Sequence, residues 1–461
     1  MASSRLSFWL RSLLAAPRRL LSRRFAREVM TLQMGSFATM GLQFITSIII
    51  ANLLNPAPFG VYYQARALLD LVAMLANLAV GQALITRLAA AYTKGDRDEC
   101  LRLLGYFLKV GLVVSLVEAG VGLLGGSVLG AVVLNDPDIG EMARILFITP
   151  PLLVAYNLVL LALQSTRQVK RLALLENGAL MLGSLLNLGV VAAGGGVSGL
   201  LYTVAFTPIL TSGAALLLYR STLPRMVGLP TLGQIVRAAP AVAFGRYFAF
   251  SALVSLDKNF ANLISLAPLL LLGNLSGDAE VAYFKVASNL TLTLLAVPMA
   301  PISRNLYAKL AEVRSCLGVA YVGRPLVQVT IGGIAMSSVM AAGLMVIAPF
   351  VLQLYRPEYG PALGAMYGLG LRCATLGFAI GLGPLYQVLG AMKLAIASKV
   401  VPALVMVGMG SVLIPSMGAA GAAWTVSATY LVGDAISACL VWWMLRREKR
   451  RAALVLSGGR G

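Results

Sequence analysis

The sequence contains no histidine, and its four cysteines lie far apart without a CxxC spacing. The absence of histidine excludes acid–base catalysis by imidazole and the usual zinc sites, so no metal and no cofactor are expected. No GxxxxGK[ST] run is present either, so we do not expect this chain to use ATP. Cys100 and Cys316 fall in predicted cytoplasmic loops, where disulfides are rare, and we expect unpaired thiols.

Charge is also scarce, since 12% of the 461 residues are charged and 59% are hydrophobic. Soluble domains carry about 25% charged residues. Here a series of stretches of about 20 apolar residues are each long enough to cross a bilayer. Only helices or closed barrels span lipid, and these runs lack the alternating pattern of barrel strands. The sequence therefore predicts an all-α polytopic membrane protein with about twelve transmembrane helices.

The placement of the 37 lysines and arginines predicts how these helices cross the membrane. Most lie in the two tails or in every second gap between apolar stretches, whereas the alternate gaps hold only Arg356. Basic residues near membrane spans stay on the cytoplasmic side, so both termini are expected in the cytoplasm. The expected location of the protein is the cell inner (cytoplasmic) membrane. The net charge of +20 is dispersed over short loops and tails. We therefore expect membrane lipids as partners and no nucleic acid.

The chain also repeats itself with an offset of about 220 residues, a regularity that indicates internal structural repeats. Tyr62-Tyr63 lines up with Tyr283-Phe284, NDPDIG (135–140) with YRPEYG (355–360), and QSTRQVK (164–170) with QVLGAMK (387–393). Two parallel repeats about an axis along the membrane normal are typical of transporters that bind substrate between the halves. The predicted organisation is a basic amphipathic cytoplasmic tail (1–28), an N-terminal six-helix lobe (29–219), a cytoplasmic linker (220–240), a C-terminal six-helix lobe (241–445) and a basic cytoplasmic tail (446–461).

The Arg-rich tail 1–28 permits two interpretations. Leucines at helical spacing among its arginines are typical of an interfacial helix that anchors the chain and fixes topology. An organellar transit peptide is the alternative, because its composition is also rich in Arg and Ser and poor in acids.

One stretch carries a family resemblance. Residues 35–90 resemble the first two helices of a Wzx-type polysaccharide or oligosaccharide flippase, with the signatures FGVY (59–62) and GQALITR (81–87). The half that begins at 241 resembles the second lobe, including VAYFKVASNLTL (281–292). That family belongs to the MOP superfamily, which also holds MATE exporters and MurJ-type lipid II flippases. Residues 31–53 lack the acidic residue of many MATE exporters and the Arg-Asp pair of MurJ-type proteins.

Charges inside the apolar stretches are candidates for function, because a charge at mid-bilayer is costly. Those near the ends of stretches reach the interface; Arg87, Lys109, Arg144 and partly Arg246 and Lys285 are of this kind. The deeper ones are Arg66, Asp70, Glu118, Asp257, Lys258, Arg372 and Asp434. Arg66 and Asp70 have the i,i+4 spacing of an ion pair. Either they form a neutralised structural pair, or they face a cavity and separate when an anionic group arrives.

A polar stripe follows one face of the seventh predicted helix: Ser251, Ser255, Lys258, Asn262 and Ser265. Such a stripe lines either a helix contact or an aqueous cavity, and the presence of Lys258 favours the cavity. Asp257 points about 100° away and is expected to pair with a neighbouring helix. A weaker stripe in the first helix comprises Ser36, Thr39, Gln43 and Thr46. Facing each other, the two stripes would form a cavity between the lobes.

Arg372 and Asp434 each lie in the middle of a predicted span. An arginine binds pyrophosphate through two parallel hydrogen bonds and stays charged, so Arg372 is a candidate for binding substrate. Asp434 looks like a lone carboxylate in the last helix. It is a candidate proton carrier, or else it forms a salt bridge with a neighbouring basic residue.

The resemblance implies a flippase for an undecaprenyl-pyrophosphate-linked oligosaccharide or polysaccharide, working by alternating access, with other polysaccharide assembly proteins as partners. The candidate substrate-binding residues are Arg66, Lys258, Arg372, Lys285, Asn262 and Gln43, and among them we expect the most from Lys258 and Arg372. The candidate ion-coupling residues are Asp434, Asp257 and Asp70, since a proton or sodium gradient is the expected energy source.

Three other functions are compatible with the sequence. A MATE-type exporter of drugs or organic cations would require a net acidic lining, whereas the deep charges include several basic ones. A membrane glycan polymerase or glycosyltransferase would require a polar catalytic loop, and the long loop 220–240 has no acid. A non-transporting scaffold that binds an anionic lipid is the third.

Overall fold

The computed structural model describes residues 23–76, 80–222, 228–243, 245, 248–293, 323–389 and 392–458. Within these ranges the regular secondary structure is helical throughout, and six segments are long and apolar enough to cross a membrane. The predicted all-helical, multi-pass membrane class is confirmed. The longer helices are α2 (Arg23–Leu53), α3 (Pro56–Ala76), α4 (Val80–Lys94), α5 (Arg97–Leu134), α6 (Pro137–Ala143), α7 (Thr149–Ser165), α8 (Val169–Ala192), α9 (Gly196–Thr222), α10 (Leu232–Ala238), α11 (Phe248–Leu275), α12 (Asp278–Ser288), α14 (Gly323–Leu352), α15 (Ala362–Leu389) and α16 (Met392–Gly458).

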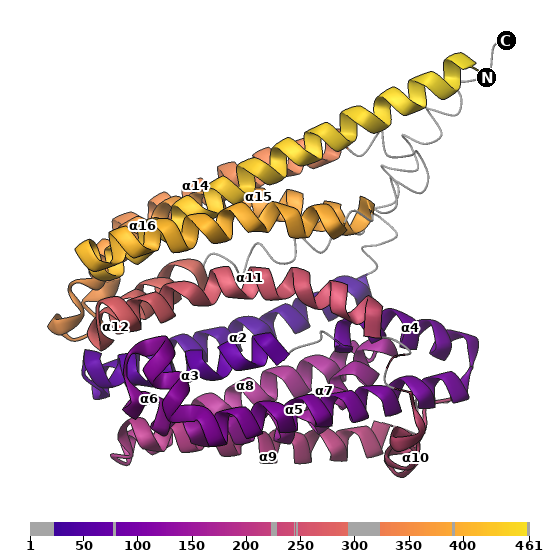
Figure 1. Cartoon of the computed structure of the whole chain (residues 1–461), viewed down its shortest axis with the longest axis horizontal. Helices are drawn as coiled ribbons and strands as arrows, with labels where there is room; N and C mark the ends of the chain where they lie inside the picture. The colour runs from indigo at the N-terminus through magenta and orange to yellow at the C-terminus, as the bar shows by residue number, and fades with distance from the viewer. Residues whose placement is uncertain are drawn as a thin grey trace.

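The helices of the two chain halves form two groups (Figure 1). The indigo and magenta helices α2–α9 pack on one another, as in the pairs α2 with α8 and α7 with α9. The orange and yellow helices α14, α15 and α16 form the other group. Helix α11 contacts α3, α4 and α5 as well as α16, while α12 contacts both α3 and α15. These two helices therefore join the halves, and the space between the halves is bounded by α11, α12 and the first helices of the chain.

The turn between α5 and α6 is built from the NDPDIG run (135–140). Asn135 ends α5 in the left-handed conformation, with φ of 58°. The Asp136 carboxylate accepts hydrogen bonds from the backbone N–H groups of Asp138 and Ile139, and Pro137 occupies the first helical position. An Asx cap followed by proline is a favoured helix start, so this turn forms as the NDPDIG run predicts.

The predicted linker 220–240 contains a short helix that packs against the N-terminal half. Thr231 and Gln234 form a capping box that starts α10. Tyr219 donates a hydrogen bond to the Pro230 carbonyl at 2.7 Å. Lys109, which was expected to reach the interface, donates to the carbonyls of Pro240 and Val242 at 3.0 and 2.9 Å. These contacts tether the linker to α5, while residues 223–227 lie outside the described ranges.

Helix α16 has two parts, which meet at a kink at Gly418. Gly418 has φ of +53°, a conformation that L side chains rarely adopt, and an added Cβ would lie 2.3 Å from a Glu280 carboxylate oxygen. The same carboxylate accepts a hydrogen bond from the Ala419 N–H at 2.6 Å. Glycine is therefore required where the PSMG run turns the chain against α12.

Some predictions fall on residues outside the described ranges. These include most of the Arg-rich tail 1–28, of which only the last residues are described and already belong to α2. The predicted cytoplasmic loop that contains Cys316 falls in the range 294–322.

The two halves meet along a seam at the end of the bundle away from the last turns of α16 (Figure 1). We define the seam by Asn52, Asn55, Gly60, Gln64, Asp278, Arg356 and Tyr359. The Asn52 amide donates to the Leu354 carbonyl at 2.8 Å and accepts from the Arg356 N–H at 2.9 Å. The Arg356 guanidinium donates to the Asn55 side-chain oxygen at 2.7 Å. Arg356, the one basic residue in the alternate gaps between apolar stretches, thus joins the two halves.

Tyr359 lies beneath these contacts and is fully buried. Its hydroxyl lies 3.0 Å from the Ala51 carbonyl and 3.2 Å from the Leu54 carbonyl, at the end of α2. Burial raises the pKa of Tyr359 above its ordinary value, so the hydroxyl stays a hydrogen-bond donor. The last turn of α2 leaves carbonyls without helical partners, and the single hydroxyl proton of this tyrosine is shared between two carbonyls there.

Helices α3 and α12 complete the seam by packing backbone against backbone. An added Cβ at Gly60 would lie 1.8 Å from the Asp278 carbonyl oxygen, far inside van der Waals contact. One turn further along, the Gln64 amide donates to the Asp278 carboxylate at 2.7 Å. The seam is therefore closed in this structure, and its closeness depends on the absence of a side chain at residue 60.

Candidate functional site

A cavity of about 890 Å³ lies between α2 and α3 of the N-terminal half and α11 and α12 of the C-terminal half. We call it the central cavity. It brings together four predicted substrate-binding residues, Gln43, Arg66, Asn262 and Lys285, and the predicted ion-coupling residue Asp70. Its other polar lining side chains are Ser47, Tyr63, Ser265 and Asn289. The two polar stripes do face a common cavity, through Gln43 on one side and Asn262 and Ser265 on the other.

Aromatic rings position the two cations of the central cavity. The Arg66 guanidinium donates to the Tyr62 hydroxyl at 3.2 Å, and its central carbon lies 5.8 Å from the centre of the same ring. The Lys285 ammonium lies 4.9 Å from the ring centre of Tyr63. Cation–π contacts of this kind hold a cation without neutralising it. Both charges therefore remain able to attract an anion.

Asp70 lines the same cavity one helical turn beyond Arg66. Among the ion pairs of the described residues, none joins Arg66 to Asp70. Both residues therefore face the central cavity without a direct ion pair, and whether they separate when an anionic group arrives stays a prediction.

Asn289 and Ser47 connect the halves across the cavity, and sequence reasoning missed both. The Asn289 amide donates to the Ser47 hydroxyl at 3.3 Å. Asn289 begins η5 (Asn289–Thr293), a turn of π-helix that continues α12. π-Turns inside helices are frequent at functional sites. The signal that could have found Asn289 is its i,i+4 spacing from Lys285, which places both residues on one helix face.

The members of the two stripes do not all face the central cavity. Lys258 lines a second cavity, and Ser255 is buried. Thr39 donates to the Gly35 carbonyl at 2.9 Å, and Thr46 is buried, so both have packing positions. The side chains of Ser36 and Ser251 lie outside what the structure describes.

The second cavity, of about 610 Å³, lies within the N-terminal half between α3, α4, α5 and α7. Asp70 and Ala73 line both cavities, so α3 forms the wall between them. Lys258 is the contribution of α11, and hence of the C-terminal half. The remaining polar residues that line the second cavity are Ser115, Glu118, Thr149, Asn157 and Gln164.

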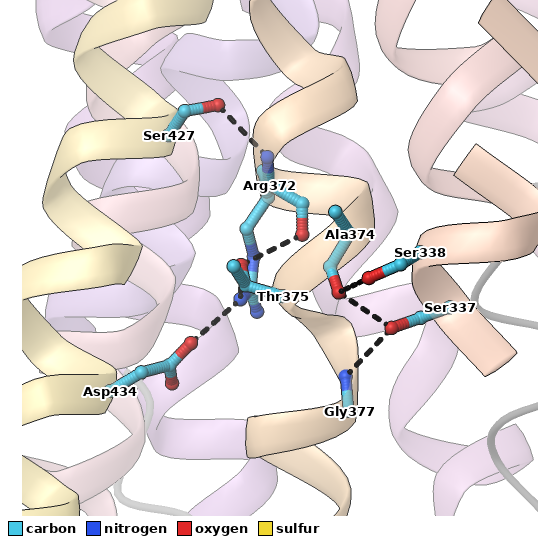
Figure 2. Close-up of polar contacts among 8 residues, drawn as sticks. All are labelled: Ser337, Ser338, Arg372, Ala374, Thr375, Gly377, Ser427 and Asp434. Carbon is cyan, nitrogen blue, oxygen red and sulfur yellow. Dashed lines mark hydrogen bonds and ion pairs between the residues drawn. The ribbon is translucent and has the colours of Figure 1, made fainter. Parts of the chain in front are cut away.

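Arg372 and Asp434 form an ion pair between α15 and α16, away from both cavities (Figure 2). The Arg372 guanidinium donates to Asp434 Oδ2 at 3.1 Å and lies 4.0 Å from the centre of the Tyr430 ring. The exposed fractions of the two side chains are 7% and 15%. The Arg372 N–H donates to the Ser427 hydroxyl, which donates to the Gly368 carbonyl.

This geometry corrects two expectations. Asp434 is not a lone carboxylate, and the salt bridge that the sequence left open is the arrangement observed. Arg372 and Lys258, from which we expected the most, do not line a common cavity. The physical reason is that the buried charge of Arg372 is compensated by the Asp434 carboxylate on the neighbouring helix α16.

Asp257 pairs with Lys399 of α16, as expected for a residue that points away from the stripe. The ammonium donates to the Asp257 carboxylate at 2.5 Å and to the Asp257 carbonyl at 2.7 Å. This ion pair ties α11 to the C-terminal group of helices.

The Arg372–Asp434 pair leads to a stability prediction. Arg372→Ala leaves the buried Asp434 carboxylate without its partner, which is expected to destabilise the protein by about 3–5 kcal/mol. The double variant Arg372→Met with Asp434→Leu should recover most of the loss, since replacement of both charges by apolar residues is often neutral. Thermal unfolding of the purified protein in detergent measures both. An unchanged unfolding temperature in Arg372→Ala, together with lost transport, would instead assign Arg372 to substrate binding.

An all-helical membrane bundle with a charged, polar cavity between its halves is the architecture of a transporter. Residues 25–307 match the sequence profile of the family described as polysaccharide biosynthesis protein. The match covers more than half of the chain, and the chain belongs to this family of Wzx-type flippases. The resemblance of the first helices is thereby confirmed, and the protein is a membrane transporter.

Solved structures of the MOP superfamily share the fold. An inward-facing MATE family multidrug transporter is 17% identical with a TM-score of 0.72, covering 89% of this chain and 96% of that one. The lipid II flippase MurJ in an inward closed conformation is 10% identical with a TM-score of 0.70, covering 89% and 87%. An outward-facing MATE family transporter is 18% identical with a TM-score of 0.63, covering 91% and 94%. Among curated proteins, no relative matches the sequence.

Proposed function

We propose that the protein moves a lipid-linked oligosaccharide or polysaccharide precursor of the undecaprenyl-pyrophosphate type across the cytoplasmic membrane. The central cavity carries this proposal. It holds two cations, Arg66 and Lys285, against one carboxylate, Asp70, and is therefore net basic. An anionic pyrophosphate fits this balance, and amide and hydroxyl side chains around it suit the hydroxyl groups of sugars.

Each lining residue has a proposed part in binding. Arg66 and Lys285 neutralise the pyrophosphate, while Gln43 and Asn262 hydrogen-bond to sugar hydroxyls. The lipid tail stays in the bilayer. Lys258 and Arg372 remain proposed substrate ligands. Lys258 would act from the second cavity, on the other side of α3, and Arg372 would act once its ion pair with Asp434 opens.

A proton or sodium gradient is the proposed energy source, with Asp434, Asp257 or Asp70 as carrier. Asp70 is supported by its position, because it lines both cavities and lies one turn from Arg66. Asp434 and Asp257 each form an ion pair with a basic residue of another helix. A proton or sodium ion that replaced the basic partner would loosen the contact between α15 and α16 or between α11 and α16.

The closed seam supports alternating access with an inward-facing conformation in this structure. The alternation of basic residues predicts that the seam loops lie on the outer side and the termini inside. With the seam closed, the central cavity is separated from the outside by the contacts of Asn52, Arg356 and Tyr359. Export then requires these contacts to break while the opposite end closes.

The basic lining also argues against an exporter of organic cations. A cationic drug in the central cavity would meet Arg66 and Lys285 and be repelled, whereas only Asp70 would attract it.

A deletion strain tests the proposed function. Loss of the protein is expected to make lipid-linked glycan accumulate on the cytoplasmic leaflet, because synthesis continues while translocation stops. The measurement is extraction and leaflet-specific labelling of the lipid-linked glycan, with a plasmid copy of the intact gene as control. Normal amounts of glycan on the outer leaflet would contradict the proposal, and so would a change confined to the sensitivity to cationic drugs.

A further inference from the structure

Near its end, α16 carries two tryptophans and two arginines that no step of the proposed transport uses. The central carbon of the Arg446 guanidinium lies 3.5 Å from the centre of the Trp442 ring. The corresponding carbon of Arg447 lies 5.5 Å from the centre of the Trp443 ring. Cation–π attraction favours such contacts, and a spacing of four residues places each pair on one helix face. We call these four side chains the Trp–Arg pairs.

The Trp–Arg pairs lie on the outer side of α16. Val441, just before them, is buried, so its face of the helix packs against the rest of the protein. By contrast, Trp442 and Trp443 are 57% and 51% exposed, and both arginines are exposed as well. Among the ion pairs of the described residues, none includes either arginine. Since a guanidinium stays charged, both arginines are able to bind an anion from outside the bundle.

The length of α16 indicates how deep in the membrane these pairs lie. The alternation of basic residues predicts that the turn at Gly418 lies on the outer side. From there to Trp442 the helix rises about 36 Å, at about 1.5 Å per residue, and the hydrocarbon core of a bilayer is about 30 Å thick. Helix α16 continues to Gly458, and its last turns extend past α11 and α15 (Figure 1). Tryptophans are typical of the membrane–water interface, so we expect the two arginines at the level of the cytoplasmic head groups.

The charge of this segment defines the partner that fits it. The run WWMLRREKRR (442–451) places pairs of like residues four positions apart, first the tryptophans, then Arg446 and Arg447, then Arg450 and Arg451. Glu448 is the single acid among the five basic residues of 446–451. A cluster of about four to eight basic residues that directly follows a transmembrane helix on the cytoplasmic side is typical of binding to anionic lipids. A negatively charged head group is therefore the complementary partner.

We propose that the Trp–Arg pairs form a binding site for the phosphate group of an anionic phospholipid in the cytoplasmic leaflet. The tryptophan rings position the two guanidiniums, and each guanidinium donates parallel hydrogen bonds to the phosphate oxygens. The acyl chains lie against the exposed apolar surface of the same tryptophans. The bound lipid holds the last helix at a fixed depth in the membrane. This site goes beyond the proposed function, because it lies outside the central cavity and its lipid is not translocated.

Tryptophan fluorescence of the full-length protein in lipid vesicles tests this inference without any glycan. Trp9→Phe with Trp424→Phe leaves Trp442 and Trp443 as the remaining tryptophans, and this variant is the parent for the test. Bromine atoms on acyl chains quench a tryptophan beside which the lipid binds. Vesicles that mix brominated phosphatidylglycerol with phosphatidylcholine, and the converse mixture, therefore give the relative affinity of the two lipids. Phosphatidylglycerol is expected to bind at least about fivefold more tightly, since one basic residue at an anionic surface contributes about that factor.

Two double variants separate this site from the general charge of the cytoplasmic face. Arg446→Gln with Arg447→Gln should lower the preference for phosphatidylglycerol at least threefold, because the phosphate loses both guanidiniums. Arg220→Gln with Arg237→Gln is the matched control, since it removes the same charge at exposed positions of α9 and α10 and should leave the preference unchanged. Thermal unfolding in detergent reports whether each variant is folded.

Three results would overturn the inference. The first is equal quenching by the two brominated lipids in the parent. The second is an unchanged preference in the folded glutamine variant of the Trp–Arg pairs, or an equal loss in the control variant. The third is loss of the preference when excess inorganic phosphate is added, which would show a site for free phosphate instead of a lipid. Failure of the proposed flippase function would appear separately, as normal glycan export in the deletion strain.

Discussion

Replacing Arg66 and Lys285 together by alanine is expected to reduce glycan export by at least about a hundredfold. A hydrogen bond to a charged group contributes about 1.5–3 kcal/mol, so two such contacts amount to at least about 3 kcal/mol, or two powers of ten. The double substitution removes both cations of the central cavity and leaves Asp70 to repel the pyrophosphate. The measurement is outer-leaflet glycan in the deletion strain that carries each variant.

Matched variants separate charge from folding. Arg66→Lys with Lys285→Arg keeps both charges and should retain much of the activity, whereas Arg237→Ala, exposed on α10, should be neutral. Lys258→Ala with Arg372→Ala is the parallel test of the residues that lie outside the central cavity. If that pair leaves export untouched, neither residue binds substrate. Export at the normal rate by the Arg66/Lys285 double variant would remove the basis of the proposed function.

A single methyl group at residue 60 is expected to prevent the seam from closing and to stop transport. In Gly60→Ala the new Cβ would overlap the Asp278 carbonyl, and overpacking of this kind costs about 1–3 kcal/mol. The closed state would lose about five- to a hundredfold in population. Outward accessibility is measured with Ser47→Cys, which lines the central cavity, in a chain whose other cysteines are serines.

An impermeant thiol reagent added outside should label this cysteine much faster in Gly60→Ala than in the parent. Gly213→Ala on α9 is the control, because its added Cβ meets nothing within 4 Å. If the cysteine in Gly60→Ala is labelled at the same rate as in the parent, and export is normal, the α3–α12 contact is not a gate.

Helical periodicity explains what the sequence could predict about the site. Gln43, Asn262 and Ser265 were identified as members of polar stripes, and they do line the central cavity. The stripe could not show which helix covers each of its members. Lys258 and Asn262 are only one turn apart, yet they line different cavities, because α3 divides the space that α11 faces.

Contacts between distant helices were beyond prediction for the same reason. Arg372 and Asp434 are 62 residues apart, and no spacing within either helix indicates that they meet. Gly60 is one of 47 glycines, and only the position of α12 makes it special. The helical membrane class followed from composition alone, since chain length and hydropathy decide it; the number of spans, the repeat symmetry and the orientation stay predictions.

The seam has a consequence for the order of synthesis. Asn52 is made early, and its partner Arg356 lies 304 residues later in the chain. At about 5–20 residues per second, the ribosome needs roughly 15–60 s to cover that distance. Throughout this interval the carbonyls that end α2 lack Tyr359, and until α12 (Asp278–Ser288) is made the face of α3 around Gly60 is uncovered as well. A nascent chain interrupted in this interval would therefore present an unsealed N-terminal half, and membrane quality control could distinguish it from the finished protein by that exposed edge.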